Sequence, residues 1–373
     1  MANILDYLDW RGDLTFAQDS FNTVDALILA QLSYVPLDGI VPLDFDARIS
    51  LKQAAEAFDP EHTDEKQRSF CYLEDQQLLA KLGQSRRFQD VLLTGYFSRT
   101  APLDDLQFSA MTCILPDGSG YISFRGTDGS IAGWKEDFNI SYMSETPGQQ
   151  LAVEYVSRFC KATSGNVMLG GHSKGGNFAV YAAVFCDAAA KRRLLRVYDF
   201  DGPGFRDDIA ASKAYTEMLP RIYCVIPQSS LVGQLLTGNT EHQIVKSSGT
   251  GVGQHLIYSW NVQGRELVFA QELSKFGVFI NRTLNGWLSS MDAPARRSLT
   301  EAVFDVIQAP EKDTFYEMNR HKLRSIGAIV KAMRELDPEA QAVLKNAIAL
   351  LAQQSKKALF PEKHVRTGKR AAK

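Results

Sequence analysis

The residues with the clearest chemical potential form a glycine-rich turn in the middle of the chain. The seven residues from Gly170 to Gly176 read Gly-Gly-His-Ser-Lys-Gly-Gly and contain the spacing G-x-S-x-G around Ser173. In that spacing a strand turns sharply into a helix, and the serine takes a strained backbone conformation. The glycines two residues to either side admit neighbouring backbone that a Cβ would block. Ser173 is therefore the candidate nucleophile.

A serine nucleophile needs a histidine that accepts its proton and a carboxylate that orients the histidine. In hydrolases with this turn the three residues follow in the order serine, acid, histidine. That order excludes His62 and His172 as the base, and His172 is expected to pack or hydrogen-bond within the turn. Two later histidines are set aside because one begins a late helix and the other lies in a polar tail: His321 and His364.

Two histidines remain as candidates for the base. His255 follows three glycines, at 249, 251 and 253, in a segment that reads as a mobile loop, and it precedes a β-like run. Such a loop lets the imidazole reach over the serine, whereas His242 opens a short predicted strand. The sequence favours His255 over His242, with the alternative that His255 only satisfies loop backbone.

Two aspartates are candidates for the acid. Asp201 closes the predicted strand Leu195 to Phe200 and precedes Gly-Pro, so its side chain is expected at the carboxyl end of a strand, where hydrolase sites form. Asp199 is on the same strand face but deeper. Asp201 is preferred, although either aspartate can instead stabilise a turn.

The tetrahedral intermediate of acyl transfer needs two backbone N–H donors for its oxyanion. Lys174 directly follows the serine, and Thr127 lies in the segment that ends the predicted strand Tyr121 to Phe124. These two residues are the predicted oxyanion hole, with the Thr127 hydroxyl as further support. The Lys174 side chain either adds a cation that favours an anionic substrate or points to the surface. Arg125 and Asp137 are expected to hold the loop through charge-assisted hydrogen bonds.

The elements around these residues alternate between strands and helices. A predicted strand, Asn166 to Leu169, comes before the serine turn, and small residues at helical spacing follow it. Further β-like runs are Phe108 to Leu115, Tyr121 to Phe124, Leu195 to Phe200, Arg221 to Ile226, His242 to Val245 and Leu256 to Trp260. This alternation predicts the α/β class, with reactive groups at the carboxyl ends of strands.

Four parts of the chain are predicted. Residues 1–106 read as a mainly helical segment that packs on or covers the core, and residues 107–262 form the core with the catalytic site. Residues 263–355 read as C-terminal helices, in which Asp337 before Pro338 suits a helix N-terminus. Residues 356–373 contain seven Lys or Arg and are expected to be a solvated, disordered tail.

Composition narrows the classes of partner. The net charge is −2, from 41 basic and 43 acidic residues, so nothing in the balance demands nucleic acid or an anionic membrane. The five cysteines lack C-x-x-C spacing, which favours a reducing compartment. No signal peptide or spanning helix is evident, so we expect a cytoplasmic protein without an integral membrane segment. No metal-ligand cluster or dinucleotide motif is present, and no cofactor is expected.

The core resembles the class-3 lipases. The resemblance rests on Phe124-Arg125-Gly126-Thr127, on Trp134 with Asp137, and on Gly171-His172-Ser173-Lys174-Gly175-Gly176, which match the patterns F-R-G-[ST], W-x-x-D and G-H-S-x-G-G. It implies an α/β-hydrolase fold, here with helical N-terminal and C-terminal additions, and a Ser-Asp-His triad. Class-3 lipases carry their acid in a D-x-V-P element, but the matching stretch, residues 222–240, contains no Asp or Glu. Asp201 therefore receives the assignment.

A second resemblance covers nearly the whole chain. Trp10-Arg11-Gly12-Asp13-Leu14, Ile226-Pro227-Gln228-Ser229-Ser230 and the element from His255 to Trp260 look like a bacterial family of lipase-like hydrolases whose substrates are uncharacterised. It implies no substrate.

The sequence thus predicts a serine hydrolase of the carboxylesterase or lipase type that cleaves small-molecule or lipid esters through an acyl-enzyme. Two alternatives remain open. One is a catalytically silent α/β-hydrolase fold used as an interaction module. The other keeps the triad but acts on thioesters or peptides, or transfers acyl groups.

Overall fold

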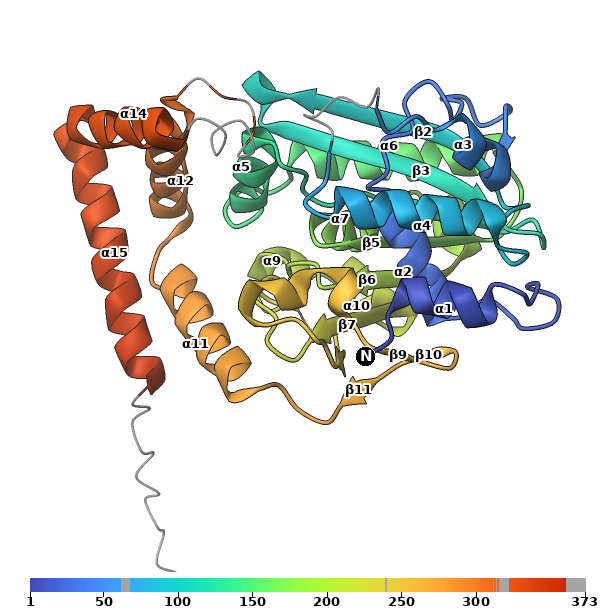
Figure 1. Ribbon diagram of the computed structural model, residues 1–373. Helices are drawn as coiled ribbons and strands as arrows, with labels where there is room; N and C mark the ends of the chain where they lie inside the picture. The colour runs from blue at the N-terminus through green and yellow to red at the C-terminus, as the bar shows by residue number, and fades with distance from the viewer. Residues whose placement is uncertain (62–67, 239, 311, 313, 315–321, 360–373) are drawn as a thin grey trace, which may run out of the picture.

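A mixed β-sheet runs through the centre of the molecule. The computed structural model describes all residues except 62–67, 239, 311, 313, 315–321 and 360–373. His62, His321, His364 and most of the basic tail therefore fall outside the described residues. Within the described part, nine strands form the sheet in the order β1-β2-β3-β4-β5-β6-β7-β8-β11 (Figure 1). Strands β4 to β8 are parallel, and the strands at both edges pair antiparallel.

The strands have the following bounds: β1 (Ile49–Ser50), β2 (Leu92–Ala101), β3 (Leu106–Ile114), β4 (Gly120–Phe124), β5 (Val167–His172), β6 (Leu194–Phe200), β7 (Ile222–Pro227), β8 (His242–Val245) and β11 (Phe269–Ala270). A separate hairpin joins β9 (Val262–Gln263) and β10 (Glu266–Leu267). Together with the helices on both faces, this is an α/β-hydrolase fold with helical additions.

Six of the predicted β-runs coincide with strands β3 to β8, but two expectations differ from the structure. The sheet starts before residue 107, because β2 belongs to it. A bulge between Thr94 and Phe97, with Gly95 at φ 66°, interrupts the alternation of β2 and hides its strand pattern. The run Leu256 to Trp260 contains a 3-10 turn, η5 (Ile257–Ser259), instead of a strand.

The N-terminal helices pack on one face of the sheet. Residues Tyr121, Tyr198 and Phe200 of the strands share a core with α2, whereas their neighbours along the strands face the opposite side. This is the two-residue alternation of strands buried on both faces. The elements before β2 are α1 (Ile4–Arg11), α2 (Thr23–Leu32), α3 (Leu51–Ala57) and α4 (Tyr72–Gln84).

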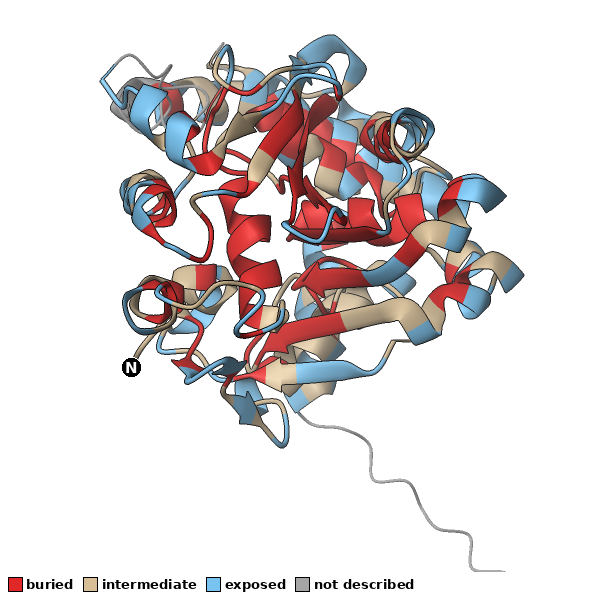
Figure 2. Ribbon diagram, turned by 90° about the vertical axis from the view of Figure 1, so that its right-hand side faces the viewer, coloured by how far each residue is buried: buried red, intermediate tan, exposed pale blue. Residues whose placement is uncertain are grey.

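The other face is covered by helices that follow the strands in the chain. Figure 2 shows buried residues concentrated in the central strands and in the helices packed against them. Helix α7 is buried along nearly its whole length because its small residues let it approach the sheet closely. The elements of this region are η2 (Pro102–Asp104), α5 (Ile131–Asn139), α6 (Pro147–Ala162), α7 (Lys174–Phe185), α8 (Ala188–Arg193), α9 (Asp207–Ala210), α10 (Lys213–Met218) and η3 (Leu219–Arg221).

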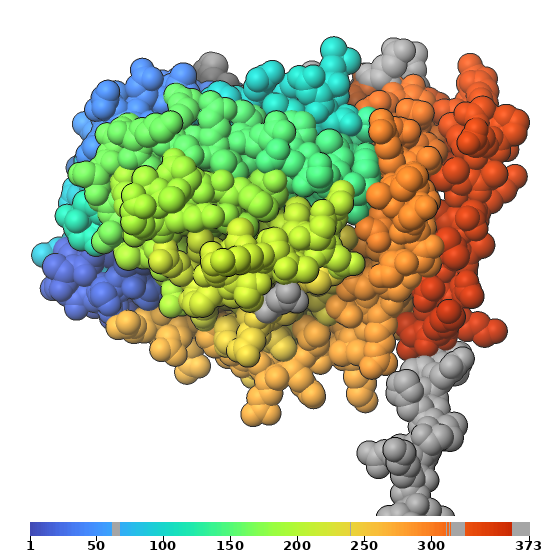
Figure 3. Space-filling view, turned by 180° about the vertical axis from the view of Figure 1, so that it is seen from behind, coloured from blue at the N-terminus to red at the C-terminus, as the bar shows by residue number. Residues whose placement is uncertain are grey.

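The C-terminal helices of the described residues lie along one side of the molecule (Figures 1 and 3). They are α11 (Lys275–Ser289), α12 (Ala293–Gln308), α14 (Lys322–Glu335) and α15 (Pro338–Leu359). Helix α15 packs on α11 and α12, and α12 contacts α5 of the core. Asp337 caps α15 through the Ala340 N–H, as the sequence predicts. Among the helices of the described residues, none is both long and apolar enough to cross a bilayer.

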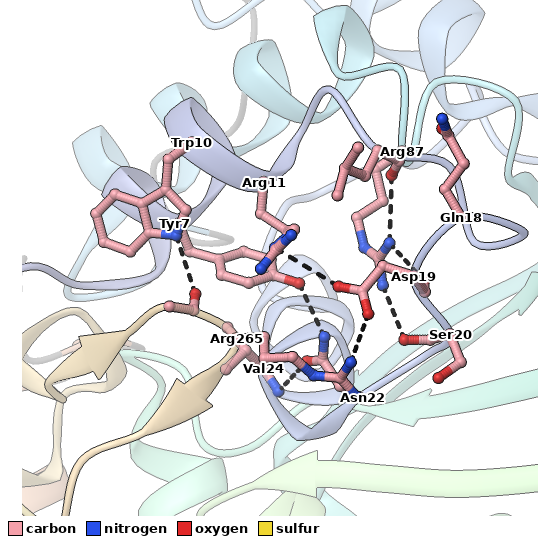
Figure 4. Close-up of polar contacts among 12 residues, drawn as sticks. Tyr7, Trp10, Arg11, Gln18, Asp19, Ser20, Asn22, Val24, Arg87 and Arg265 are labelled. Carbon is pink, nitrogen blue, oxygen red and sulfur yellow. Dashed lines mark hydrogen bonds and ion pairs between the residues drawn. The ribbon is translucent and has the colours of Figure 1, made fainter.

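A buried arginine anchors the N-terminal segment (Figure 4). Arg87 pairs with Asp25 through two hydrogen bonds of 2.8 and 2.6 Å and also donates to the Asp19 and Ser20 carbonyls. Trp10 donates to the Gly264 carbonyl at the β9–β10 turn. The opening motif that contains Trp10 thus ties α1 to the hairpin of β9 and β10.

Candidate active site

Ser173 occupies the turn between β5 and α7. Its φ of 58° and ψ of −133° are the strained conformation expected of the nucleophile turn. A Cβ at Gly171 would lie 2.3 Å from the backbone of Gly175, and one at Gly175 would lie 2.1 Å from the Phe124 carbonyl oxygen. Only glycine fits at these two positions, so the two glycines allow the tight turn in which Ser173 sits.

Asp201 and His255 are in direct contact. The Nδ1 atom of His255 lies 2.6 Å from Oδ2 of Asp201, which is fully buried. The other carboxylate oxygen accepts hydrogen bonds from the Ser230 hydroxyl at 2.5 Å and from the Gly233 N–H at 3.1 Å. Asp201 follows β6, and His255 ends the short turn η4 (Gly251–His255). The Asp201 carboxylate is thus held in place through one oxygen and bonded to His255 through the other.

Asp199 and His242, the alternative acid and base, lie elsewhere in the sheet. The Asp199 carboxyl accepts the Gly202 N–H at 2.9 Å and contacts the Cys224 thiol at 3.5 Å. The same sulfur lies 3.1 Å from Nδ1 of His242. Burial raises the pKa of Asp199 to about 7. Neither Asp199 nor His242 is among the described residues that line the cavity at Ser173.

The loop of residues 124–128, which contains the predicted oxyanion donor Thr127, lies against the serine turn. A Cβ at Gly126 would lie 3.0 Å from the Ser173 Cβ. The Thr127 hydroxyl donates to Asp137 at 2.5 Å, so its proton is used there and only the backbone N–H of Thr127 remains for an oxyanion. Burial raises the pKa of Asp137 to about 6. Arg125 pairs with Asp128 at 3.3 Å, so it and Asp137 brace the loop through different partners.

Lys174 differs from both expectations for its side chain. It is fully buried and forms an ion pair of 2.9 Å with Glu136 of α5, which is also fully buried. The ammonium also donates to the carbonyl oxygen of Gln107 at 3.1 Å, and Glu136 accepts the Gly148 N–H at 2.8 Å. The sequence cannot show this pairing because Glu136 is distant in the chain. The backbone N–H of Lys174, at the first position of α7, lacks an intrahelical acceptor.

A cavity of about 350 Å³ opens over Ser173, and His255 and Thr127 also line it. Most of its wall is apolar, and none of the described lining residues is Lys or Arg. Sequence reasoning missed these wall residues, because helical spacing alone does not tell which residues of a helix face a cavity. The apolar wall includes Phe70, Trp134, Phe138, Val232, Leu235, Leu236, Leu256, Leu284, Trp287 and Leu288.

The buried carboxylate of Asp75 anchors the segment that carries His255. Asp75 of α4 accepts hydrogen bonds from the Tyr258 hydroxyl at 2.6 Å, from the Gln31 amide at 2.7 Å and from the Ser69 hydroxyl. Burial raises the pKa of Asp75 to about 6. Side chains that come before residue 107 in the chain therefore hold the segment of His255 in place.

Comparison with known proteins identifies the family of this chain. The Mbeg1-like family matches residues 82–305, which is more than half of the chain. The chain belongs to the Mbeg1-like family. A search of solved structures finds similarity to a crystal structure of M37 lipase, with 16% sequence identity and a TM-score of 0.37, covering 58% of this chain and 70% of that chain. No functionally curated protein matches the sequence.

The Mbeg1-like region contains Ser173, Asp201, His255 and Thr127. The cavity wall extends beyond it, because Tyr34 and the stretch 69–71 come earlier in the chain. The structure thus adds an N-terminal contribution to the site of this Mbeg1-like protein.

Proposed function

We propose that this Mbeg1-like protein is a serine hydrolase that cleaves carboxylic esters, with Ser173 as nucleophile, His255 as base and Asp201 as orienting acid. The proposal is carried by the 2.6 Å contact between His255 Nδ1 and Asp201 Oδ2 at a cavity that the strained Ser173 also lines. Ser173 and His255 both line this cavity, Asp201 is bonded to His255, and the three residue types are those that acyl transfer by a serine nucleophile requires.

The mechanism follows from the hydrogen bonds. With its Nδ1–H donated to Asp201, His255 keeps Nε2 free to accept the proton of the Ser173 hydroxyl. The serine oxygen attacks the ester carbonyl carbon, and the backbone N–H groups of Thr127 and Lys174 stabilise the oxyanion. His255 then returns the proton to the leaving alcohol, and water cleaves the acyl-enzyme by the same steps in reverse order.

The buried ion pair supports this chemistry indirectly. Lys174 and Glu136 connect the start of α7 to α5, and α5 carries Asp137, the partner of Thr127. Both proposed oxyanion donors are thus attached to one rigid group of elements, which favours preorganised donors over mobile ones.

The cavity suits a neutral substrate with an apolar acyl or alcohol part. Its wall is mostly aliphatic and aromatic, and a cation that would attract an anionic group is absent from the described lining residues. We therefore expect uncharged esters to be better substrates than esters with a carboxylate or phosphate near the scissile bond.

A fluorophosphonate probe tests the proposal. Wild-type protein is expected to become labelled on Ser173 and to hydrolyse p-nitrophenyl esters, and Ser173→Ala should lose both properties. Ser141→Ala is the matched control, because Ser141 also lines the cavity but its hydroxyl donates to the Phe138 carbonyl. Folded wild-type protein that takes no label and hydrolyses no ester, or label retained by Ser173→Ala, contradicts the proposal.

A further inference from the structure

A buried tyrosine just after α2 connects two parts of the candidate site. The Tyr34 hydroxyl lies 3.0 Å from Nδ1 of His172, the residue before the nucleophile. Gly126, in the loop of residues 124–128, packs against the same hydroxyl oxygen. The packing is tight, since a Cβ at Gly126 would lie 2.2 Å from that oxygen. The N-terminal segment thus contacts the loop of residues 124–128 and the serine turn through one side chain.

The hydrogen bonds of His172 determine where its ring carries the proton. Its Nε2 lies 2.8 Å from the backbone carbonyl oxygen of His255, which can only accept. Burial lowers the pKa of His172 well below its ordinary value, so the ring is neutral and has a single N–H. Because Nε2 holds that hydrogen, Nδ1 is the acceptor and the Tyr34 hydroxyl is its donor.

This arrangement holds His255 at two points. Its backbone carbonyl is bonded to His172, and its side chain is bonded to Asp201. The two imidazole rings also pack together, with 4.4 Å between their centroids. Movement of His255 away from Ser173 therefore breaks at least one of these contacts.

We infer that Tyr34 and His172 are positioning residues that hold His255 in place for Ser173, an inference that rests on the proposed ester hydrolysis. Neither side chain takes part in the proton transfers described above, and both act through the backbone of His255. Tyr34 lies outside the Mbeg1-like region, so the N-terminal segment takes part in aligning the base as well as covering the sheet.

Three variants and one control test the inference through kcat and KM. His172→Leu removes the donor to His255 and is expected to lower kcat about 100-fold, the effect of a small misplacement of a catalytic group, with KM nearly unchanged. Tyr34→Phe removes one hydrogen bond from the ring and is expected to lower kcat about tenfold. His172→Gln should recover most of the activity, because its amide nitrogen can donate where Nε2 does.

Tyr215→Phe is the matched control. It also removes a buried tyrosine hydroxyl, one that lies 3.1 Å from the Thr240 hydroxyl in a part of the fold away from the cavity. Its kcat should stay at the wild-type value. The inference fails if Tyr34→Phe and His172→Leu fold and keep wild-type kcat, or if His172→Gln is as slow as His172→Leu.

Nitrogen-15 NMR of the histidine rings supplies a readout that needs no activity. His172 is expected as the neutral tautomer with hydrogen on Nε2, and the downfield proton of the Asp201–His255 hydrogen bond should weaken in Tyr34→Phe but not in Tyr215→Phe. A ring protonated on Nδ1, or on both nitrogens at neutral pH, overturns the inference. Inert wild-type protein with the expected NMR signals would instead reject ester hydrolysis and leave the positioning of His255 standing.

Discussion

Two neighbouring regions of this protein each bring an aspartate and a histidine together, and they differ in almost everything else. In the first, Asp201 and His255 come from loops at the ends of strands and are bonded to each other beside Ser173. In the second, Asp199 and His242 lie on β6 and β8, and the Cys224 thiol of β7 stands between them. The same pair of residue types therefore occurs twice, with both aspartates near the carboxyl end of β6.

The difference indicates that the position of an aspartate or histidine relative to the end of a strand determines whether its side chain can meet a substrate. Asp199, Cys224 and His242 are direct neighbours across three parallel strands, so the ladder holds them in the sheet and away from the cavity. Burial raises the pKa of the Cys224 thiol well above its ordinary value, which disfavours the reactive thiolate. Asp201 and His255 lie where loops can meet a substrate.

Replacing the two histidines gives the largest expected contrast. His255→Gln should lower kcat/KM for an ester on the order of 10⁵-fold, because the serine loses its base. His242→Gln should leave kcat/KM close to wild type, since its ring is bonded to the Cys224 sulfur and His242 is not among the described residues that line the cavity. Steady-state kinetics with purified, folded variants measures both values. Equal losses in the two variants, or a larger loss in His242→Gln, would break the distinction between the regions.

Replacing the two aspartates gives the next contrast. Asp201→Asn should lower kcat by about 10⁴-fold, because an amide in this position no longer stabilises the His255 tautomer with hydrogen on Nδ1. Asp199→Asn should lose far less, since an amide oxygen can still accept the Gly202 N–H. Kinetics together with thermal unfolding separates catalytic from structural loss. A stable Asp199→Asn variant that is the slower of the two would reassign the acid.

The pH dependence of stability gives the smallest expected effect. It tests the second region, through Asp199. The pKa of Asp199 is raised to about 7 in the folded protein. Its carboxyl group therefore keeps its proton at pH values at which the same group in the unfolded chain is already ionised. Stability conferred by this group is therefore present at low pH and lost as pH rises toward 7. The loss is on the order of 4 kcal/mol in the free energy of unfolding.

Urea unfolding from about pH 4 to about pH 8 measures this loss. Asp199→Asn cannot titrate, so its stability should fall less over this range than that of wild type. Asp75 and Asp137 have raised pKa values in both proteins and cancel in the difference. If the free energy of unfolding changed equally with pH in the two proteins, Asp199 would be ionised in the folded protein over this range.

Local patterns predicted the elements of the site better than their surroundings. The glycine spacing around Ser173 specifies a strand, a turn and a helix within a short stretch, and β5 and α7 follow it. Chain order and strand ends were enough to choose Asp201 and His255, which the structure brings into contact. Their catalytic roles stay predictions.

What the sequence could not predict depends on contacts between distant segments. Lys174 reads as an exposed or substrate-facing cation, yet it is buried because Glu136 and backbone carbonyls surround it. The tyrosine at position 34 carries no motif, and only the packing of α2 on the sheet brings its hydroxyl to His172. Strand β2 was missed because its bulge breaks the two-residue alternation.

The left-handed backbone at Ser173, the proposed nucleophile, lowers the stability of the fold at the residue that the proposed activity needs. Ser173 has a φ of 58° and Asp201 a φ of 57°, conformations that cost a residue with a side chain about 1–2 kcal/mol each and cost glycine little. Ser173→Gly should therefore relieve strain while it removes the reactive hydroxyl. Selecting variants of this protein by heat resistance alone would enrich such changes, and the most thermostable members of the library would be inactive.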